Sequence, residues 1–274
     1  MKVLHVHQIA HIPQLLCKEL RNQGVKAMFV ERASPEIIDD YDIVHGHYAL
    51  NRNTIDAFRL ARSRGIPFIL HCHGSDLRLL TGTERVGLPF FYRKISQYIR
   101  KRSSAILLST PDLTEFEPEG TYIPNPVDLE LFRPMPEVEK TDRSLIMGKQ
   151  ISGSRILEFI KQDIQYDCVN NGQKIDWPAN VECLEYVPYK ELPEFFNRYT
   201  EMLGTFGDLI SMARLEAMAC GLRTFTDFEE KYISFYEGQS PDRAQEPREF
   251  ITRFHSPEIA VKKLIGIYSD AESP

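Results

Sequence analysis

Short apolar runs alternate with amphipathic segments along most of this chain. Runs such as 3–6, 26–30 and 68–72 are separated by segments such as 13–22 and 51–63, in which apolar residues recur at helical spacing. Apolar runs of this length are typical of buried strands, and strands that alternate with helices form parallel sheets with helices on both faces. The alternation therefore predicts an α/β fold.

The segment 123–136 interrupts this pattern. It reads IPNPVDLELFRPMP and contains four prolines, which fix φ and lack the N–H that a helix or strand needs. The alternation resumes beyond it, with an apolar run at 144–148. We therefore expect two α/β domains, 1–132 and 133–274, joined by a proline-rich linker. We allow for the last helix, which begins after Ser256, packing back on the first domain.

The composition excludes several classes of protein. Hydrophobic residues make up 42% and charged residues 26% of the 274 residues, as in ordinary globular proteins. The net charge of -6 gives no attraction for nucleic acid, and we expect no such partner. The five cysteines are widely spaced without a C-x-x-C motif, which argues against a disulfide framework or structural zinc and favours a reducing cytoplasm. No run approaches the ~18 apolar residues of a membrane-spanning helix.

Three His-x-His pairs close three of the apolar runs. They are His5 and His7, His45 and His47, and His71 and His73. Ligands of open α/β sheets bind beyond the carboxyl ends of the strands, and residues two apart on a strand point the same way. We therefore expect the pairs to converge on one site, with His5 in a packed role.

The third pair lies in the string HCHGSD at 71–76. Gly74 would allow close backbone approach or an unusual φ, and Asp76 could orient a hydroxyl group or His73. The simpler alternative is a strand-end histidine bonded to backbone, followed by an aspartate that caps the next helix. A further alternative is a divalent metal held by the histidine pairs and Asp76, as in zinc hydrolases. That alternative leaves the downstream motifs without a role, so we assign no metal ligand.

The segment 208–221 reads DLISMARLEAMACG and places Asp208 before an expected helix and Glu216 within it. The free N–H groups at the helix N-terminus near Ser211 favour an anion, and the two carboxylates could bracket a sugar. The alternative is a buried, alanine-rich helix whose glutamate pairs with a cation.

Five strings resemble, in order, motifs of the retaining glycosyltransferases of family 4, which have the GT-B fold. They are DIVHGHY (42–48), HCHGSD (71–76), IPNPVDLELFRP (123–134), LEYVPYKELPEFFNR (184–198) and LEAMACG (215–221), the last being similar to the second half of the E-x7-E motif. The resemblance covers about residues 1–270 and would make this an unusually short member. It implies two Rossmann-like domains facing across a cleft, the first on the acceptor side and the second binding a nucleotide-sugar donor.

The resemblance also implies roles for individual residues. The catalytic candidates, at the transferring sugar and the acceptor, are His73, Asp208 and Asp76. The donor-binding candidates are Glu216 on the ribose, Gly148, Lys149 and Arg155 on the diphosphate, and Ser211 at the helix N-terminus. The acceptor-side candidates are His45, His47, His71, Gln8 and His11. GT-B enzymes need no metal at the diphosphate, so the resemblance implies no cofactor.

The sequence departs from the family pattern at three places. Asp208 stands where the family has glutamate, and Ser152-Gly153 stands where it has Lys-Gly. The loop 8–13 contains no glycine, whereas relatives carry a glycine-rich loop after the first strand.

The segment 90–102 reads FFYRKISQYIRKR, with five basic residues among four aromatic ones. This profile is typical of an interfacial amphipathic helix, and the alternative is a packed helix with a solvated basic face. We therefore expect a cytoplasmic protein, with peripheral contact at the inner face of the membrane as an option.

These observations together predict a retaining glycosyltransferase that moves a sugar from a nucleoside-diphosphate sugar to a hydroxyl acceptor, either a saccharide or a lipid-linked group. One alternative is a GT-B-fold nucleotide-sugar binding protein or partner subunit with weak or no activity. A metal-dependent hydrolase is the less favoured alternative.

Overall fold

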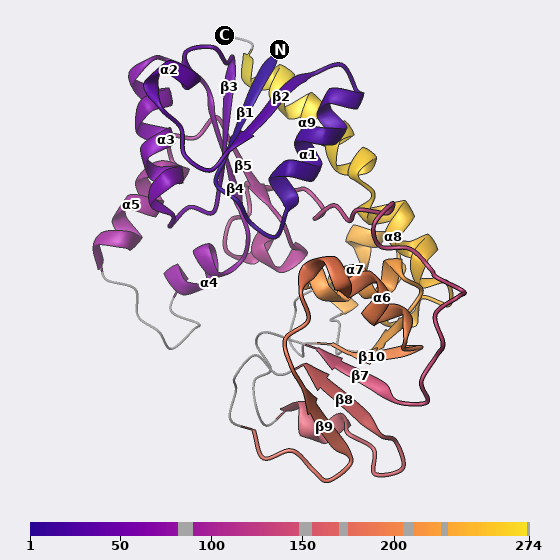
Figure 1. The fold of residues 1–274 in the computed structure, drawn as a ribbon. Helices are drawn as coiled ribbons and strands as arrows, with labels where there is room; N and C mark the ends of the chain where they lie inside the picture. The colour runs from indigo at the N-terminus through magenta and orange to yellow at the C-terminus, as the bar shows by residue number, and fades with distance from the viewer. Residues whose placement is uncertain (82–89, 148–154, 170–174, 205–210, 226–229, 273–274) are drawn as a thin grey trace. The chain divides into compact units, whose positions relative to one another are not determined.

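The computed structural model describes residues 1–81, 90–147, 155–169, 175–204, 211–225 and 230–272. The chain divides into two compact units, one of Met1–Pro126 with Pro257–Pro274 and one of Val127–Ser256 (Figure 1). The division thus falls at Pro126 and not at residue 132. The last helix falls within the sequence boundaries 133–274 of the second domain but belongs to unit 1, which is the packing allowed for it from the sequence.

Unit 1 is built on a parallel sheet of six strands in the order β2-β1-β3-β4-β5-β6. The strands are β1 (Lys2–Val6), β2 (Lys26–Val30), β3 (Ile43–His47), β4 (Phe68–Cys72), β5 (Ala105–Leu108) and β6 (Thr121–Tyr122). The helices are α1 (Ile12–Asn22), α2 (Pro35–Ile38), α3 (Arg52–Ser63), α4 (Ser75–Thr81), α5 (Phe90–Arg100) and α9 (Pro257–Glu272), with a 3-10 turn η1 (Pro111–Glu115).

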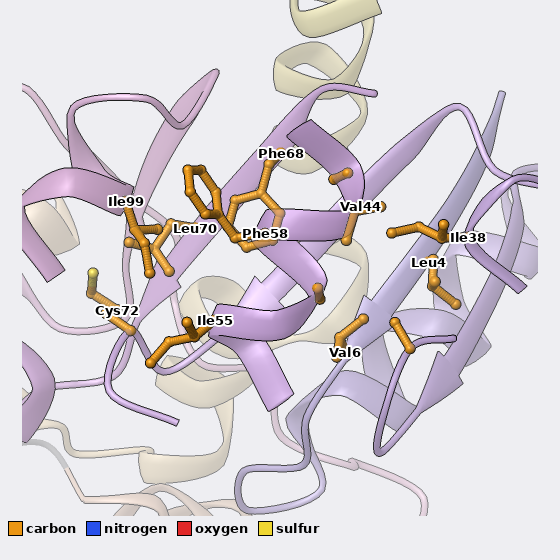
Figure 2. Packing of buried hydrophobic residues seen from close by; sticks show 14 of the residues in the cluster. Leu4, Val6, Ile38, Val44, Ile55, Phe58, Phe68, Leu70, Cys72 and Ile99 are labelled. Atoms are coloured by element: carbon orange, nitrogen blue, oxygen red, sulfur yellow. The ribbon is translucent and has the colours of Figure 1, made fainter. Parts of the chain in front are cut away.

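The two faces of this sheet differ because successive strand residues point to opposite sides. Leu4, Val44 and Leu70 belong to the buried apolar cluster on one face, and Figure 2 shows them among the other members of the cluster, which include Phe58 of α3. Burial of each such side chain contributes about 1.5–3 kcal/mol. The other face carries His5, whose neighbours in the strand belong to the apolar face. Helix α9 packs against β3 and against α1, and Figure 1 shows it beside α1.

Unit 2 is built on a smaller parallel sheet in the order β11-β10-β7-β8-β9. The strands are β7 (Ser144–Met147), β8 (Tyr166–Val169), β9 (Val181–Leu184), β10 (Glu201–Leu203) and β11 (Arg223–Phe225). The helices are α6 (Leu192–Asn197), α7 (Met212–Ala219) and α8 (Pro247–His255), with 3-10 turns η2 (Arg155–Phe159), η3 (Tyr189–Glu191), η4 (Glu230–Tyr236) and η5 (Pro241–Arg243).

Each strand order reverses its direction once. In unit 1 the reversal lies between β1 and β3, and in unit 2 it lies between β7 and β10. The loops that leave such neighbouring strands part to opposite faces, and the gap between them is where open α/β sheets bind ligands. In unit 1 the two loops begin at His7 and Tyr48. In unit 2 the loop after β10 leads into α7.

Candidate functional site

The structure brings five histidines together on one face of the unit 1 sheet, whereas the spacing of the pairs predicted that all six would converge. We call them the histidine array: His5, His45, His47, His71 and His73. His5 lies opposite His45 in the register of β1 and β3, and His47 lies opposite His71 in that of β3 and β4. Ring centroids of neighbouring members are 4.3 to 5.4 Å apart. His7 turns instead to Glu31, 2.8 Å from its Nδ1.

A chain of hydrogen bonds connects Tyr268 on α9, through the array, to the partly exposed His73. Tyr268 Oη lies 2.6 Å from His45 Nδ1 and 3.3 Å from His5 Nε2. His5 Nδ1 is 3.0 Å from His47 Nε2, and His47 Nδ1 is 3.0 Å from His73 Nε2. A neutral imidazole donates once and accepts once, so the tautomer of each ring in this chain sets the tautomer of the next.

Burial holds the array neutral. The rings of His5, His45, His47 and His71 have no exposed surface. Burial is the main cause that lowers the pKa of all five histidines, and it lowers that of His5 and His71 to about 3. The three acceptor-side candidates at 45, 47 and 71 therefore lie beneath the surface. Of the array, His73 is the member that a ligand reaches first.

Asp76 holds the loops that follow β3 and β4. Its carboxylate accepts backbone N–H bonds from Ala49, His73 and Gly74, each at 2.9 Å. Burial raises the pKa of Asp76, and these backbone hydrogen bonds oppose that effect. The residue lies in the first turn of α4 and accepts backbone N–H groups from outside that helix, so it is not the N-cap that the simpler alternative expected. The contacts give it a positioning role for His73, and contact with a hydroxyl group stays a prediction.

Gly74 adopts φ +118°, a backbone conformation that favours glycine. A Cβ there would lie 2.4 Å from Arg78 Nη1. Arg78 in turn donates from Nε to Asp112, at 2.8 Å in a largely buried ion pair. The glycine is therefore needed both for its φ and for the space that the guanidinium occupies.

The loop after β1 follows a left-handed path without glycine. His7, Ala10 and His11 have φ values of 72°, 45° and 61°. Tyr48, which starts the loop after β3, has φ 65°. Each non-glycine residue in this region costs on the order of 1–3 kcal/mol, and such strain gathers at ligand-binding sites. Gln8 and His11 are exposed on this loop.

In unit 2 the candidate group is Glu216 on α7. Ser211 caps this helix, because its Oγ accepts the backbone N–H of Arg214 at 3.3 Å. Glu216 is only 4% exposed, and burial raises the pKa of its carboxyl to about 8, while a hydrogen bond with Tyr189 opposes the shift. Across the described residues, no cation pairs with Glu216, in contrast to the buried-pair alternative.

Several candidates fall outside what the structure describes. Gly148, Lys149 and Asp208 lie outside the described residues. Arg155 begins the turn η2, and its side chain is not described either. That Glu216 and Asp208 face His73 across a cleft stays a prediction, since each unit is known by itself.

The basic, aromatic segment 90–102 forms α5 and the turn beyond it. Tyr98 is 45% exposed and lies between Arg62 and Arg102, whose Cζ atoms are 5.8 and 4.2 Å from the centroid of its ring. Ile99 is buried, so one side of the helix packs on unit 1. None of the helices in the described ranges is long and apolar enough to cross a membrane.

Sequence patterns did not identify two tyrosines that complete these sites. Tyr268 lies on the apolar stripe of the last helix, and this position gave no sign of its bonds to His45 and His5. Tyr189 follows Pro188 in the segment 184–198, and its partner Glu216 is distant in sequence. A buried tyrosine needs a partner for its hydroxyl group, which is the signal that could have found both.

Comparison with known proteins supports the fold. Sucrose-phosphate synthase from Thermosynechococcus elongatus matches with a TM-score of 0.65 at 11% identity, over 98% of each chain. UDP-GlcNAc 2-epimerase from Methanocaldococcus jannaschii matches with a TM-score of 0.52 at 10% identity, over 98% of this chain and 100% of the other. No family model and no curated sequence matches this chain. The two parallel-sheet α/β units are those of the GT-B fold.

Proposed function

We propose that the protein is a retaining glycosyltransferase that uses a nucleoside-diphosphate sugar and resembles family 4. Unit 2 would bind the donor and unit 1 would present a hydroxyl acceptor, either a saccharide or a lipid-linked group. The fold supports this proposal, since a synthase that shares it over nearly the whole chain is named for making sucrose phosphate. An epimerase named for UDP-GlcNAc shares the fold too, so the transfer reaction rests on the site residues.

The observation that carries the proposal is the environment of Glu216. Its carboxyl group is buried at the helix that follows the switch point of the unit 2 sheet, with Tyr189 as its partner within the described residues. A carboxylate can accept about four hydrogen bonds, so capacity remains for two ribose hydroxyl groups. Their donation would favour the ionised form and repay part of the cost of burial.

The remaining groups would act on the departing and transferring parts of the donor. The N-terminus of α7 behind Ser211, with Lys149 and Arg155, would stabilise the developing diphosphate charge without a metal. Asp208 and His73 would contact the transferring sugar. Contact of α5 with an anionic membrane surface would place the enzyme near a lipid-linked acceptor.

Nucleotide binding tests the donor half directly. At a ligand concentration 100 times Kd, the free energy of unfolding of the wild-type protein should rise by about 2.7 kcal/mol with one of UDP, GDP or ADP. Glu216→Ala should lose most of this stabilisation, whereas Glu249→Gln, an exposed glutamate on α8, should keep it. No shift with any of the three nucleotides in the wild-type protein would contradict donor binding.

Sugar transfer needs a separate assay, because the sequence also favours a second candidate, a nucleotide-sugar binding protein without transferase activity. Its support is Asp208 in place of glutamate and Ser152-Gly153 in place of Lys-Gly. Nucleotide stabilisation together with no hydrolysis or transfer of any UDP- or GDP-sugar would favour this candidate. Release of the anomerically retained product would favour the enzyme.

A further inference from the structure

One member of the histidine array, His71, is buried without a hydrogen-bond partner for its ring among the described residues. Neither ring nitrogen of His71 has a hydrogen-bond partner among the described residues, and the ring has no exposed surface. A neutral imidazole carries one N–H donor, and leaving a buried donor or acceptor unpaired costs the free energy of its lost hydration. A bound ligand would therefore give the unpaired ring of His71 the partner that it lacks.

The neighbours of His71 indicate which ligand fits. His47, His71 and His73 each offer one ring nitrogen, and these three nitrogens lie within 4.8 Å of one another. Three nitrogens on a tetrahedral ion, at about 2.0–2.1 Å from it, are about 3.4 Å apart. Small side-chain rotations would therefore bring all three onto one ion. Imidazole suits divalent ions of zinc, cobalt, nickel and copper, and it binds them in its neutral form.

We propose that His47, His71 and His73 form a binding site for a divalent transition-metal ion of the zinc class. The site is distinct from the donor diphosphate and does not depend on the proposed transferase activity. His47 and His71 come from adjacent strands in register, and His73 follows β4, so the sheet itself fixes the spacing of the ligands.

The rest of the array would then serve to orient the ligands. With His47 bound through Nδ1, its Nε2–H donates to His5 Nδ1 at 3.0 Å. His5 Nε2–H then donates to Tyr268 Oη, and the tyrosine hydroxyl donates to His45 Nδ1. The three hydrogen bonds from His47 to His45 then each have a donor and an acceptor, and the bond between His47 Nδ1 and His73 Nε2 is replaced by the ion. A partner for the second ring nitrogen is what fixes a metal-bound histidine in most sites.

The second histidine group near the sheet is a weaker candidate for the same ion. His5, His45 and His47 also offer nitrogens within 4.8 Å of one another. Both nitrogens of His5, however, already bond to His47 and Tyr268, and Nδ1 of His45 bonds to Tyr268. Binding there would break this chain at His5. Binding at the first group replaces the hydrogen bond between His47 Nδ1 and His73 Nε2, and it satisfies His71, whose ring nitrogens have no partner among the described residues.

Charge and access also fit the first group. His73 is half-buried, so the ion would have its open coordination position on that side, as zinc sites with three protein ligands do. Asp76 lies close by, with its carboxylate on the backbone N–H of His73 at 2.9 Å, and would offset part of the positive charge. Cysteine takes no part in this group.

Metal binding can be measured on the untagged, full-length chain. After treatment with a chelator and dialysis, titration with Co²⁺ should give one equivalent bound and the visible absorption of a tetrahedral, nitrogen-ligated ion. Zn²⁺ should displace it and raise the melting temperature. His7→Asn, which removes a histidine that bonds to Glu31 outside the array, should bind as the wild type does. Absence of Co²⁺ and Zn²⁺ binding to the folded wild-type protein would overturn the proposal.

The variant His71→Leu separates a metal ligand from a merely unpaired core residue. As a metal ligand, its loss should abolish Co²⁺ absorption and make the melting temperature independent of Zn²⁺. In the metal-free state the same variant should melt at or above the wild-type temperature, because a buried unpaired ring is replaced by an apolar side chain. Should His71→Leu fail to fold, His73→Gln at the half-buried end provides the same test. A variant that still binds one equivalent of Co²⁺ with unchanged absorption would overturn the proposal.

Discussion

Each unit holds a buried acid on a helix that follows one of its strands, and the two acids are satisfied in different ways. Asp76 in unit 1 accepts three backbone N–H bonds from the loops after β3 and β4. Glu216 in unit 2 is almost as buried, and its described partner is the hydroxyl of Tyr189. The oxygens of Asp76 are used by backbone N–H groups, so this residue stabilises the loops of unit 1. Glu216 can accept further hydrogen bonds, so it is available to a ligand.

The same contrast separates the loops around the two acids. In unit 1, Gly74, Tyr48 and the loop 7–11 hold left-handed conformations next to the strands. The bonds of Asp76 to Ala49 and His73 help to hold two of these loops in place. In unit 2, the group of interest sits on a regular helix with a capped N-terminus. In unit 1 the candidate residues are therefore held in position by strained loops that hydrogen-bond to an aspartate. In unit 2 the candidate residue is held in position by a regular helix.

The largest effect should come from Asp76→Ala. Removal of the carboxylate leaves three backbone N–H groups without their acceptor, each costing about 1–3 kcal/mol. We expect the free energy of unfolding to fall by about 3–5 kcal/mol in a chemical denaturation experiment. Asp56→Ala, on the surface of α3 with arginines around it, should change it by less than about 1 kcal/mol. A loss below about 1 kcal/mol for Asp76→Ala would remove the distinction between the two acids.

The next effect concerns pH and Glu216. The unfolded carboxyl ionises near 4.5 and the folded one near 8, so the folded state holds an extra proton between these values. Stability should therefore decrease as pH rises from about 4.5 to 8. Glu216→Gln cannot ionise and should be more stable than the wild type at pH 9, by a few kcal/mol. Denaturation at pH 5, 7 and 9 measures the difference, and equal pH profiles for the two proteins would show that the carboxyl is not held protonated.

The smallest effect should come from relief of strain in the loop after β1. Ala10 has φ 45°, which glycine adopts without the steric penalty of a Cβ. The gain is offset by the larger entropy of glycine in the unfolded chain, so Ala10→Gly should stabilise by less than about 1 kcal/mol. Thermal melting resolves a change of this size. Destabilisation would mean that the Ala10 side chain contributes packing that outweighs its strain.

Much of the fold could be predicted from the sequence because its signals are local. The alternation of apolar runs and helical segments gave the parallel sheets, and strands at 26–30 and 68–72 have the expected bounds. The expected convergence of the histidine pairs followed from the period of a strand. Helix α8 was missed, since the charged segment that contains it lacks a clear apolar run. The start of α9 was predicted, but a start signal does not say which sheet the helix will cover.

The sequence by itself determined which residues share a face and which strands end in histidine, because side-chain direction follows from the period of the backbone. Only the tertiary structure decided that His45, His47 and His71 would be fully buried, that Tyr268 would join them, and that Asp76 would be saturated by backbone donors. These outcomes depend on contacts between residues far apart in the chain. Burial then lowers the pKa values of the histidines and leaves the ring nitrogens of His71 without described partners. No local sequence pattern predicts either outcome.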